Sequence, residues 1–329
     1  MSRKVVRKMN ERYCVLLTND DGVDAPGIHA LMVGLLKSGI SFVTIAPEKN
    51  QSACSMSMTL QKPMKMSERN DIVAEVCSEA FANNEVKSGD EGPTGRIFSL
   101  AGTPSDCMIV GLSGALEELT PELTPSLCVS GINLGANVSI DVLHSGTVAG
   151  AREASLYGLP SLATSLGTFE AGHFGPAVEA TISVVQRLLK ILPCKPENLL
   201  RPNRGWLRDN AEYEETTRLF SALQRGDVFL SLNTPPQWNG KITPTKVGLR
   251  WYRNALHRED MGEGNYYSID GVTVIDDTEK YCDIGALSKG EASLTVMSTW
   301  PEGHPLDIPS NLLRTNFELG DDGWPLWLS

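Results

Sequence analysis

Two adjacent carboxylates, Asp20 and Asp21, are the residues whose types and spacing point most directly to chemistry. They follow the apolar run 13–17 and stand immediately before Gly22. Neighbouring carboxylates repel each other unless a cation lies between them, and a hard divalent ion of the Mg²⁺ or Mn²⁺ type prefers oxygen ligands. An Asp-Asp-Gly turn is the alternative, because both residue types are common in turns. The pair alone leaves both interpretations open.

A second group of polar residues follows the apolar run 126–130. Asn133 and Asn137 lie beside Gly131 and Gly135. Glycine lets the backbone approach a ligand closely, and an Asn side chain supplies a neutral oxygen ligand or an amide donor. The spacing therefore predicts a loop that contacts a ligand.

A third group, Ser145, Gly146 and Thr147, leads into a segment of small residues that reads as a helix. Exposed amides at a helix N-terminus favour a phosphate, and the two hydroxyls add further donors. A Ser or Thr helix cap, with close helix packing at Gly150, is the alternative.

The elements that must position these groups alternate between strand and helix. After the first strand, apolar residues recur at helical spacing, at Ile28, Leu31, Met32, Leu35 and Leu36. The run 40–46 then predicts a second strand, so this unit is a right-handed βαβ crossover. The run 96–101, a helix from Pro104 and the run 126–130 continue the pattern. We predict an α/β fold with a mostly parallel, Rossmann-like sheet, in which ligands bind outside the carboxyl ends of the strands.

Composition limits the class of protein and its partners. The chain has 329 residues, of which 21% are charged and 41% hydrophobic, with a formal net charge of −11. This charge argues against extended nucleic acid as a partner, because neutralising phosphates needs clustered Lys and Arg. A small anionic ligand is compatible with it where a bound cation reverses the local field.

Cysteine usage and hydropathy indicate a cytoplasmic protein. The seven cysteines form no CxxC pair, which is typical of reduced thiols inside the cell. No apolar segment approaches the roughly 20 residues that span a bilayer, so we expect no membrane partner. Residues 1–12 begin with basic residues and continue with polar ones, which predicts a flexible tail rather than a signal peptide.

The motifs together match one known family in their order and spacing. They comprise Leu16-Leu17-Thr18-Asn19-Asp20-Asp21-Gly22 with Ala25-Pro26-Gly27, Ala46-Pro47 with Asn50-Gln51-Ser52 and Ser55-Met56-Ser57, Gly102-Thr103-Pro104-Ser105-Asp106-Cys107, and Ser130-Gly131-Ile132-Asn133 through Ser145-Gly146-Thr147-Val148. Across roughly residues 13 to 166 the chain resembles the SurE family of survival-protein nucleotidases and phosphatases. A weaker likeness covers 283–296 and resembles the late helix and final strand of the family.

This resemblance implies a SurE-like catalytic domain over 13–240. Segments near 68–96 and 195–220 have no counterpart in the family and are expected to be insertions. Residues 241–329 would then supply a hairpin and oligomerisation region, a late helix, a strand and a C-terminal tail, in which Trp324 and Trp327 dock back on the body.

The resemblance also implies the ligands and the pocket. A divalent metal, Mg²⁺ or Mn²⁺, would be held by oxygen atoms of Asp20, Asp21, Ser52 and Asn133. Asp20 and Asp21 would be catalytic. The phosphate pocket would be lined by Asn137, Ser145, Gly146 and Thr147, with Asn19 and Ala53 close by. The motifs contain no His or Cys cluster that would indicate zinc.

Two residues depart from the family pattern. The family usually has Gly after the metal-binding Ser, whereas this chain has Ala53, which would disturb a tight turn if that position needs a positive φ. The family usually has Tyr where this chain has His144. That ring is either a proton donor or a packing replacement, and a single His near the motifs favours packing.

The reaction expected from the resemblance is hydrolysis of a phosphate monoester, with a nucleoside monophosphate as the leading substrate. Asp20 would activate the attacking group, or would itself attack to form a phospho-aspartyl intermediate. Two other functions are open: a catalytically impaired, metal-dependent nucleotide-binding or regulatory protein, and a broad acid phosphatase or exopolyphosphatase. The base preference, the 5′ or 3′ position and the physiological metal are undetermined by the sequence.

The stretch 245–276 resembles the extended hairpin through which family members associate, which implies a homodimer or homotetramer. A hairpin alone cannot readily bury an apolar face. Its aromatic residues would either stack on a nucleobase or pack in an interface, and the interface is favoured. They are Trp251, Tyr252, Tyr266 and Tyr267.

Overall fold

The structure is a computed structural model that describes residues 12–82, 92–170, 172–196, 199, 215–269, 273–277, 279, 281–302, 304 and 307–328. Residues 1–11 of the expected tail therefore lie outside the described residues. The same holds for 83–91 and for 197–198 and 200–214, which belong to the two expected insertions.

A central sheet of nine strands carries the fold, in the order β3-β4-β2-β1-β5-β6-β7-β13-β8. Neighbouring strands run parallel except in two pairs, β3 with β4 and β7 with β13. The strands are β1 (Arg12–Thr18), β2 (Phe42–Pro47), β3 (Met66–Glu68), β4 (Gly95–Leu100), β5 (Leu123–Leu134), β6 (Ser161–Leu166), β7 (Val228–Thr234), β8 (Ile242–Thr245) and β13 (Ala292–Ser298). The predicted mostly parallel α/β sheet is confirmed.

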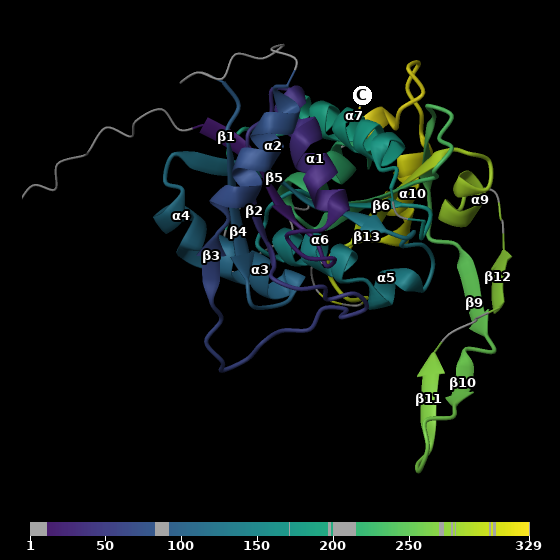
Figure 1. Cartoon of the computed structure of the whole chain (residues 1–329). Helices are drawn as coiled ribbons and strands as arrows, with labels where there is room; N and C mark the ends of the chain where they lie inside the picture. Colours follow the sequence, from purple (N-terminus) through teal and green to yellow (C-terminus); the bar gives the residue numbers. More distant parts are fainter. Residues whose placement is uncertain are drawn as a thin grey trace, which may run out of the picture.

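Helices cover both faces of this sheet (Figure 1). One face carries α1 (Pro26–Lys37), α2 (Asn70–Ala80), α7 (Gly175–Ile191) and α8 (Glu215–Arg225), which share the largest apolar core with the strands. The other face carries α3 (Pro104–Val110) and α6 (Gly146–Leu156), which pack against each other. The shorter helices are η1 (Gly111–Ala115), α4 (Leu116–Leu119), α5 (Asp141–His144), α9 (Asp283–Leu287), α10 (Ser310–Arg314), η2 (Thr315–Phe317) and η3 (Leu326–Leu328).

The predicted βαβ unit is present as β1, α1 and β2. Helix α1 begins with Pro26, whose fixed φ suits a first helical turn. All five apolar residues that predicted its buried face are fully buried. The helix ends before Gly39, which adopts φ +74, a conformation that glycine reaches without steric conflict.

The third predicted strand is longer than its apolar run. The sequence predicted a strand over 126–130 that opens into a glycine loop, whereas β5 extends from Leu123 to Leu134. Its later residues pair with β6 after an irregularity between Ser130 and Asn133. The predicted strand is therefore confirmed, but its length was underestimated, because hydrophobic periodicity does not detect a ladder that continues through a bulge at glycine.

The C-terminal part contains the expected hairpin strands, a late helix and a final strand. Strands β9 (Leu249–Arg253) and β12 (Thr273–Asp277) pair antiparallel, as do β10 (Leu256–Glu259) and β11 (Tyr266–Ile269), and they project away from the body (Figure 1). Trp327 is buried and donates its indole N–H to Asn316 at 3.0 Å, so this part of the tail does dock back. Within the described residues no helix is long and apolar enough to cross a membrane.

Candidate functional site

The two carboxylates lie at the point where the sheet changes direction. From β1 the chain moves to β2 and β4 on one side, and later returns to β5 on the other side of β1. Asp20 and Asp21 follow β1 directly, at the carboxyl ends of these parallel strands. In open α/β sheets ligands bind in the crevice at this position.

Asp20 is buried, with 3% of its surface exposed. Thr147 Oγ1 donates a hydrogen bond to its Oδ1 at 2.5 Å. The pKa of Asp20 is raised to about 6, chiefly by burial; the Thr147 hydroxyl opposes this increase and the charge of Asp21 contributes to it. Asp20 is therefore mainly a carboxylate at neutral pH, and a cation beside it would reduce the cost of burying this charge.

Asp21 lies nearer the surface than Asp20 and is also held by its neighbours. The backbone amide of Leu134 donates to its Oδ2 at 3.3 Å, which connects the ends of β1 and β5. Burial raises the pKa of Asp21, and hydrogen bonds from the Leu134 amide and the Ser52 hydroxyl oppose the increase. The predicted ligands Asp21 and Ser52 are thus brought together.

The N-terminus of α6 approaches Asp20 closely because Gly146 has no side chain. A Cβ at this position would lie 2.7 Å from both Asp20 Cβ and Cys54 Sγ. Ser145 is the N-cap and its Oγ accepts a hydrogen bond from the Val148 amide at 3.0 Å. The helix therefore points its positive end at the carboxylate.

The capping alternative for this segment is therefore realised in part. Ser145 caps the helix, and a Cβ on Gly150 would lie 2.9 Å from Thr18 Cγ2 and 3.0 Å from Ser130 Oγ. Thr147 nevertheless uses its hydroxyl on Asp20 rather than on the helix backbone. Capping by Ser145 and contact with the carboxylate by Thr147 coexist.

The three predicted Asn residues have different surroundings. Asn19 is fully buried and closes the carboxylate turn, since its amide donates to Gly22 O at 2.8 Å and its oxygen accepts from Gly22 N at 3.2 Å. Asn133 donates to Gly135 O at 2.8 Å, which orients its side chain. Asn137 donates to Ser165 Oγ at 3.0 Å, and its backbone bonds to the Asn233 side chain.

The two departures from the family pattern have structural consequences. Ala53 is exposed and adopts φ +58, the left-handed conformation that favours glycine. His144 is exposed at the end of α5, and its carbonyl accepts from the Ser55 amide at 2.9 Å. The packed ring favoured from the sequence is therefore not observed in the chain.

The donor set fits a hard divalent cation. A buried and a half-buried carboxylate are adjacent, and in the described parts of the chain no Lys, Arg or His side chain forms an ion pair with either. The predicted set has only two acidic ligands, and no group of three or more His, Cys, Asp or Glu side chains suited to a metal occurs among the described residues. Carboxylate, hydroxyl and amide oxygens completed by water suit Mg²⁺ or Mn²⁺ rather than zinc.

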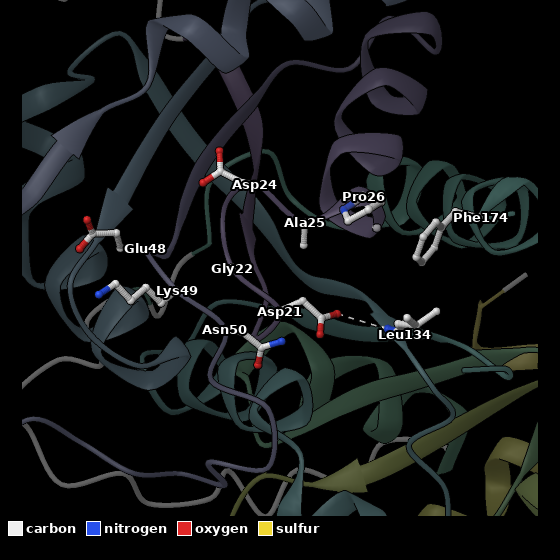
Figure 2. Close-up of a pocket in the computed structure, with 11 residues that line it drawn as sticks. Asp21, Gly22, Asp24, Ala25, Pro26, Glu48, Lys49, Asn50, Leu134 and Phe174 are labelled. Carbon is white, nitrogen blue, oxygen red and sulfur yellow. Dashed lines mark hydrogen bonds between the residues drawn. The ribbon is translucent and has the colours of Figure 1, made fainter. Parts of the chain in front are cut away.

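A cavity of about 430 Å³ opens on the Asp21 side of the carboxylate pair (Figure 2). Its walls come from the loops after β1 and β2, the start of α1, the end of β5 and the residue before α7. The lining residues are Asp21, Gly22, Asp24, Ala25, Pro26, Gly27, Glu48, Lys49, Asn50, Leu134 and Phe174. The cavity therefore combines an apolar wall with a charged rim.

Asp24 on this rim was not singled out from the sequence, although it lies within the motif that follows the carboxylates. Arg69, from the segment that the sequence predicted to be an insertion, donates to both of its oxygens, at 2.7 and 3.0 Å. Arg69 also pairs with Asp71 at 2.6 Å. The sequence signal that could have identified Asp24 is its charge within the loop that follows the carboxylates. Nothing in the sequence indicated that Arg69 would contact it.

Comparison with known proteins gives consistent results. Residues 15–257 match the family model described as Survival protein SurE. A protein of Caldanaerobacter subterraneus named 5'-nucleotidase SurE is 42% identical over 285 residues, which cover 85% of this chain and 89% of that protein. One of Moorella thermoacetica with the same name is 34% identical over 285 residues, covering 85% and 88%. The crystal structure of the SurE protein from Aquifex aeolicus is similar in fold, with a TM-score of 0.57 at 24% identity, and covers 93% of this chain and 98% of that one.

Proposed function

The chain belongs to the SurE family and is accordingly a hydrolase of phosphate monoesters, and we propose that it is a metal-dependent nucleotidase whose leading substrate is a nucleoside monophosphate. The observation that carries this proposal is the pair formed by the buried Asp20 and the half-buried Asp21. Neither has an ionic partner among the described residues, and Asp20 faces the N-terminus of α6. A cation and a phosphate together would complete this arrangement of charges.

A divalent ion would be held by Asp20, Asp21, Ser52 and Asn133. When bound, it supplies positive charge that polarises the phosphoryl group and lowers the pKa of water. The support for this set is the contact of Ser52 and the Leu134 amide with Asp21, which places the loop after β2 and the end of β5 at the same carboxylate.

Asp20 is the proposed general base. Its Oδ1 is held by Thr147, so Oδ2 is the atom that would accept the proton of the attacking water. Direct attack by Asp20 on phosphorus, with departure of the alcohol and later hydrolysis of the acyl phosphate, is the alternative route. The stereochemical course at a chiral, oxygen-isotope-labelled phosphate separates the two routes: one in-line displacement by water inverts the configuration at phosphorus, whereas two displacements through Asp20 retain it.

The phosphate would lie against the N-terminus of α6, near Ser145, Gly146 and Thr147. Helix N-terminal amides favour an anion, and the close approach of Gly146 brings them near Asp20. Asn137 is held by Asn233 and Ser165 in the segment that precedes this helix. Asn19 and Ala53 would border the pocket from the turns after β1 and β2.

The nucleoside would occupy the cavity next to Asp21. Its volume of about 430 Å³ is within the range of small-molecule sites. Leu134 and Phe174 offer an apolar wall, while Asp24 and Lys49 offer polar contacts for hydroxyls or a base (Figure 2). This cavity favours a nucleotide over inorganic polyphosphate, because a chain of phosphates would make little use of an apolar wall.

The C-terminal hairpin is the proposed contact between subunits of a homodimer or homotetramer. Trp251 is 58% exposed, and Leu256 and Ile269 are also exposed. Apolar side chains exposed along a projecting hairpin are typical of a surface that a partner covers.

The absence of a disulfide among the described cysteines supports the cytoplasmic location expected from the sequence.

Phosphate release from a panel of substrates tests the proposal. The panel contains purine and pyrimidine nucleoside 5′- and 3′-monophosphates, a chromogenic phosphate and tripolyphosphate, each with metal-stripped protein to which Mg²⁺ or Mn²⁺ is returned. A nucleotidase gives a higher kcat/KM for at least one nucleotide than for the chromogenic ester. Equal values throughout would indicate a broad acid phosphatase, and tight nucleotide binding without release would indicate a regulatory protein.

A further inference from the structure

The segment 137–147 leads from β5 to the start of α6 and is anchored at several points. Ser139 adopts φ +52, and its amide donates to Asp283 Oδ2 at 3.1 Å. At the other end, Ser55 Oγ donates to Leu143 O at 2.7 Å. The segment ends in the residues proposed to bind phosphate, so its anchors determine where these residues lie.

Two of the anchors come from the base of the projecting hairpin. Arg250 and Tyr252 are two residues apart in β9 and therefore lie on the same face of this strand. Tyr252 OH donates to Asp141 Oδ1 at 2.5 Å, and Arg250 Nη1 pairs with Asp141 Oδ2 at 3.3 Å. Trp251, between them, is exposed. Side chains on one face of β9 therefore bond to the body of the protein, whereas Trp251 on the other face is exposed.

Arg250 is itself fixed from two sides. Its backbone amide donates to Ser139 Oγ at 2.7 Å, and its guanidinium binds Asp276 of β12 through Nε at 2.7 Å and Nη2 at 2.9 Å. Only 19% of its side chain is exposed, and 16% of that of Asp141. The bidentate pair with Asp276, whose side chain is 27% exposed, fixes the orientation of the guanidinium.

Asp141 transmits this anchoring to the proposed phosphate loop. It is the first residue of α5, and its carbonyl accepts a hydrogen bond from the Ser145 amide at 3.0 Å. Ser145 in turn caps α6, whose second residue, Thr147, bonds Asp20. Hydrogen bonds therefore connect the base of the hairpin to Asp20 through the short segment that runs from Asp141 to Thr147.

We infer that Arg250 and Tyr252 are positioning residues, which act through Asp141 to hold Ser145, Gly146 and Thr147 where a phosphate binds. This inference rests on the proposed function, because it takes the N-terminus of α6 as the phosphate site. The hairpin base is then part of the site's framework. A change in the hairpin alters phosphate affinity without any contact with the ligand.

Tyr252→Phe tests the inference, because it removes one hydroxyl and keeps the ring. In the metal-loaded, full-length protein the KM for a nucleoside monophosphate and the Kd for inorganic phosphate rise about three- to tenfold, the factor expected for one hydrogen bond, while kcat changes less than twofold. Tyr267→Phe is the matched control, because it removes the same hydroxyl from an exposed residue of β11 that forms no side-chain hydrogen bond within the described part of the chain. An unchanged Kd for phosphate in Tyr252→Phe would overturn the inference.

A double-mutant cycle tests whether Tyr252 acts through Asp141. In an Asp141→Ala background, which lacks the acceptor oxygen, the added Tyr252→Phe change has less than half of its effect on the phosphate Kd, because the two residues share one interaction. Full additivity would contradict the inference.

Hydrogen exchange keeps the inference testable if the protein proves not to hydrolyse nucleotides. Amide exchange over 142–149 becomes about three- to tenfold faster in Tyr252→Phe than in Tyr267→Phe, whether or not substrate is turned over. Identical exchange in the two variants would contradict the positioning role, whereas absence of phosphate release from the wild-type protein would contradict the proposed function alone.

Discussion

Thr147 Oγ1 lies 2.5 Å from Asp20 Oδ1 and joins the start of α6 to the end of β1. Both residues are buried, so water does not replace this bond when it is broken. The hydroxyl fixes one oxygen of the carboxylate and thereby leaves Oδ2 for a cation or a proton. The same bond places the helix N-terminus beside the residue proposed as the general base.

Thr147→Val removes this hydroxyl with little change in shape. A hydrogen bond to a charged group contributes about 1.5–3 kcal/mol, so kcat/KM for a nucleoside monophosphate should fall at least about tenfold. Thr147→Ser keeps the donor and should retain most of the activity. Equal losses in the two variants, measured under saturating metal, would contradict a specific role of the hydroxyl, because Thr147→Ser keeps it.

Ala53→Gly should stabilise the protein, because Ala53 has φ +58 and the family usually has glycine there. The left-handed conformation disfavours a Cβ, so glycine relieves this strain. Glycine also has a larger backbone entropy in the unfolded chain, and the net increase in the free energy of unfolding is about 0.5–1 kcal/mol. Ala74→Gly, on the exposed side of α2, is the control and should destabilise by about 1 kcal/mol. Urea unfolding measures both, and destabilisation by both substitutions to the same extent would refute the strain at Ala53.

Glu153 should make the stability depend on pH. Burial raises its pKa from 4.5 to about 7, and the charge of Asp106 adds to the increase. The folded state binds this proton more tightly than the unfolded state does. The free energy of unfolding therefore falls as pH rises from about 4.5 to 7, and above pH 7 the folded state bears the full cost of burying the charge of Glu153. Glu153→Gln should therefore stabilise the protein by about 1–3 kcal/mol at pH 8 and by little at pH 4.5. Parallel stability curves for the two proteins would contradict this assignment.

Arg69→Gln should alter substrate preference rather than stability. Exposed ion pairs contribute little to folding, but Arg69 orients Asp24 at the rim of the cavity in Figure 2. We expect KM for a nucleoside monophosphate to rise about three- to tenfold, the factor typical of one lost polar contact, with kcat/KM for glycerol phosphate unchanged. Arg96→Gln is the control, since Arg96 forms a similar pair with Glu68. A parallel loss on both substrates would place Asp24 outside the nucleoside site.

The parts of the fold that the sequence predicted are those determined by local patterns. Helical spacing from Ile28 to Leu36 and the proline at the start of α1 specify one element and its buried face. The carboxylates after the first strand could be placed at the ligand edge because parallel strands share that edge. Local order was sufficient for each of these predictions.

What the sequence did not predict depends on contacts between distant residues. Tyr252 meets Asp141 across 111 positions, and Arg69 meets Asp24 across 45. Neither pair has a spacing signal, because each forms only once the sheet and the hairpin are assembled. Local patterns also did not predict that Glu153 is buried, since a glutamate in a helix is ordinarily exposed.

The most direct test of the central claim is phosphate release from a nucleoside monophosphate by metal-stripped wild-type protein and Asp20→Asn, each titrated with Mn²⁺ and Mg²⁺. Asparagine keeps the size of the side chain but removes its charge and its ability to accept the proton. We predict release that requires metal in the wild-type protein and falls by about 100-fold or more in Asp20→Asn. Release without metal, or equal release by both folded proteins, would contradict the account.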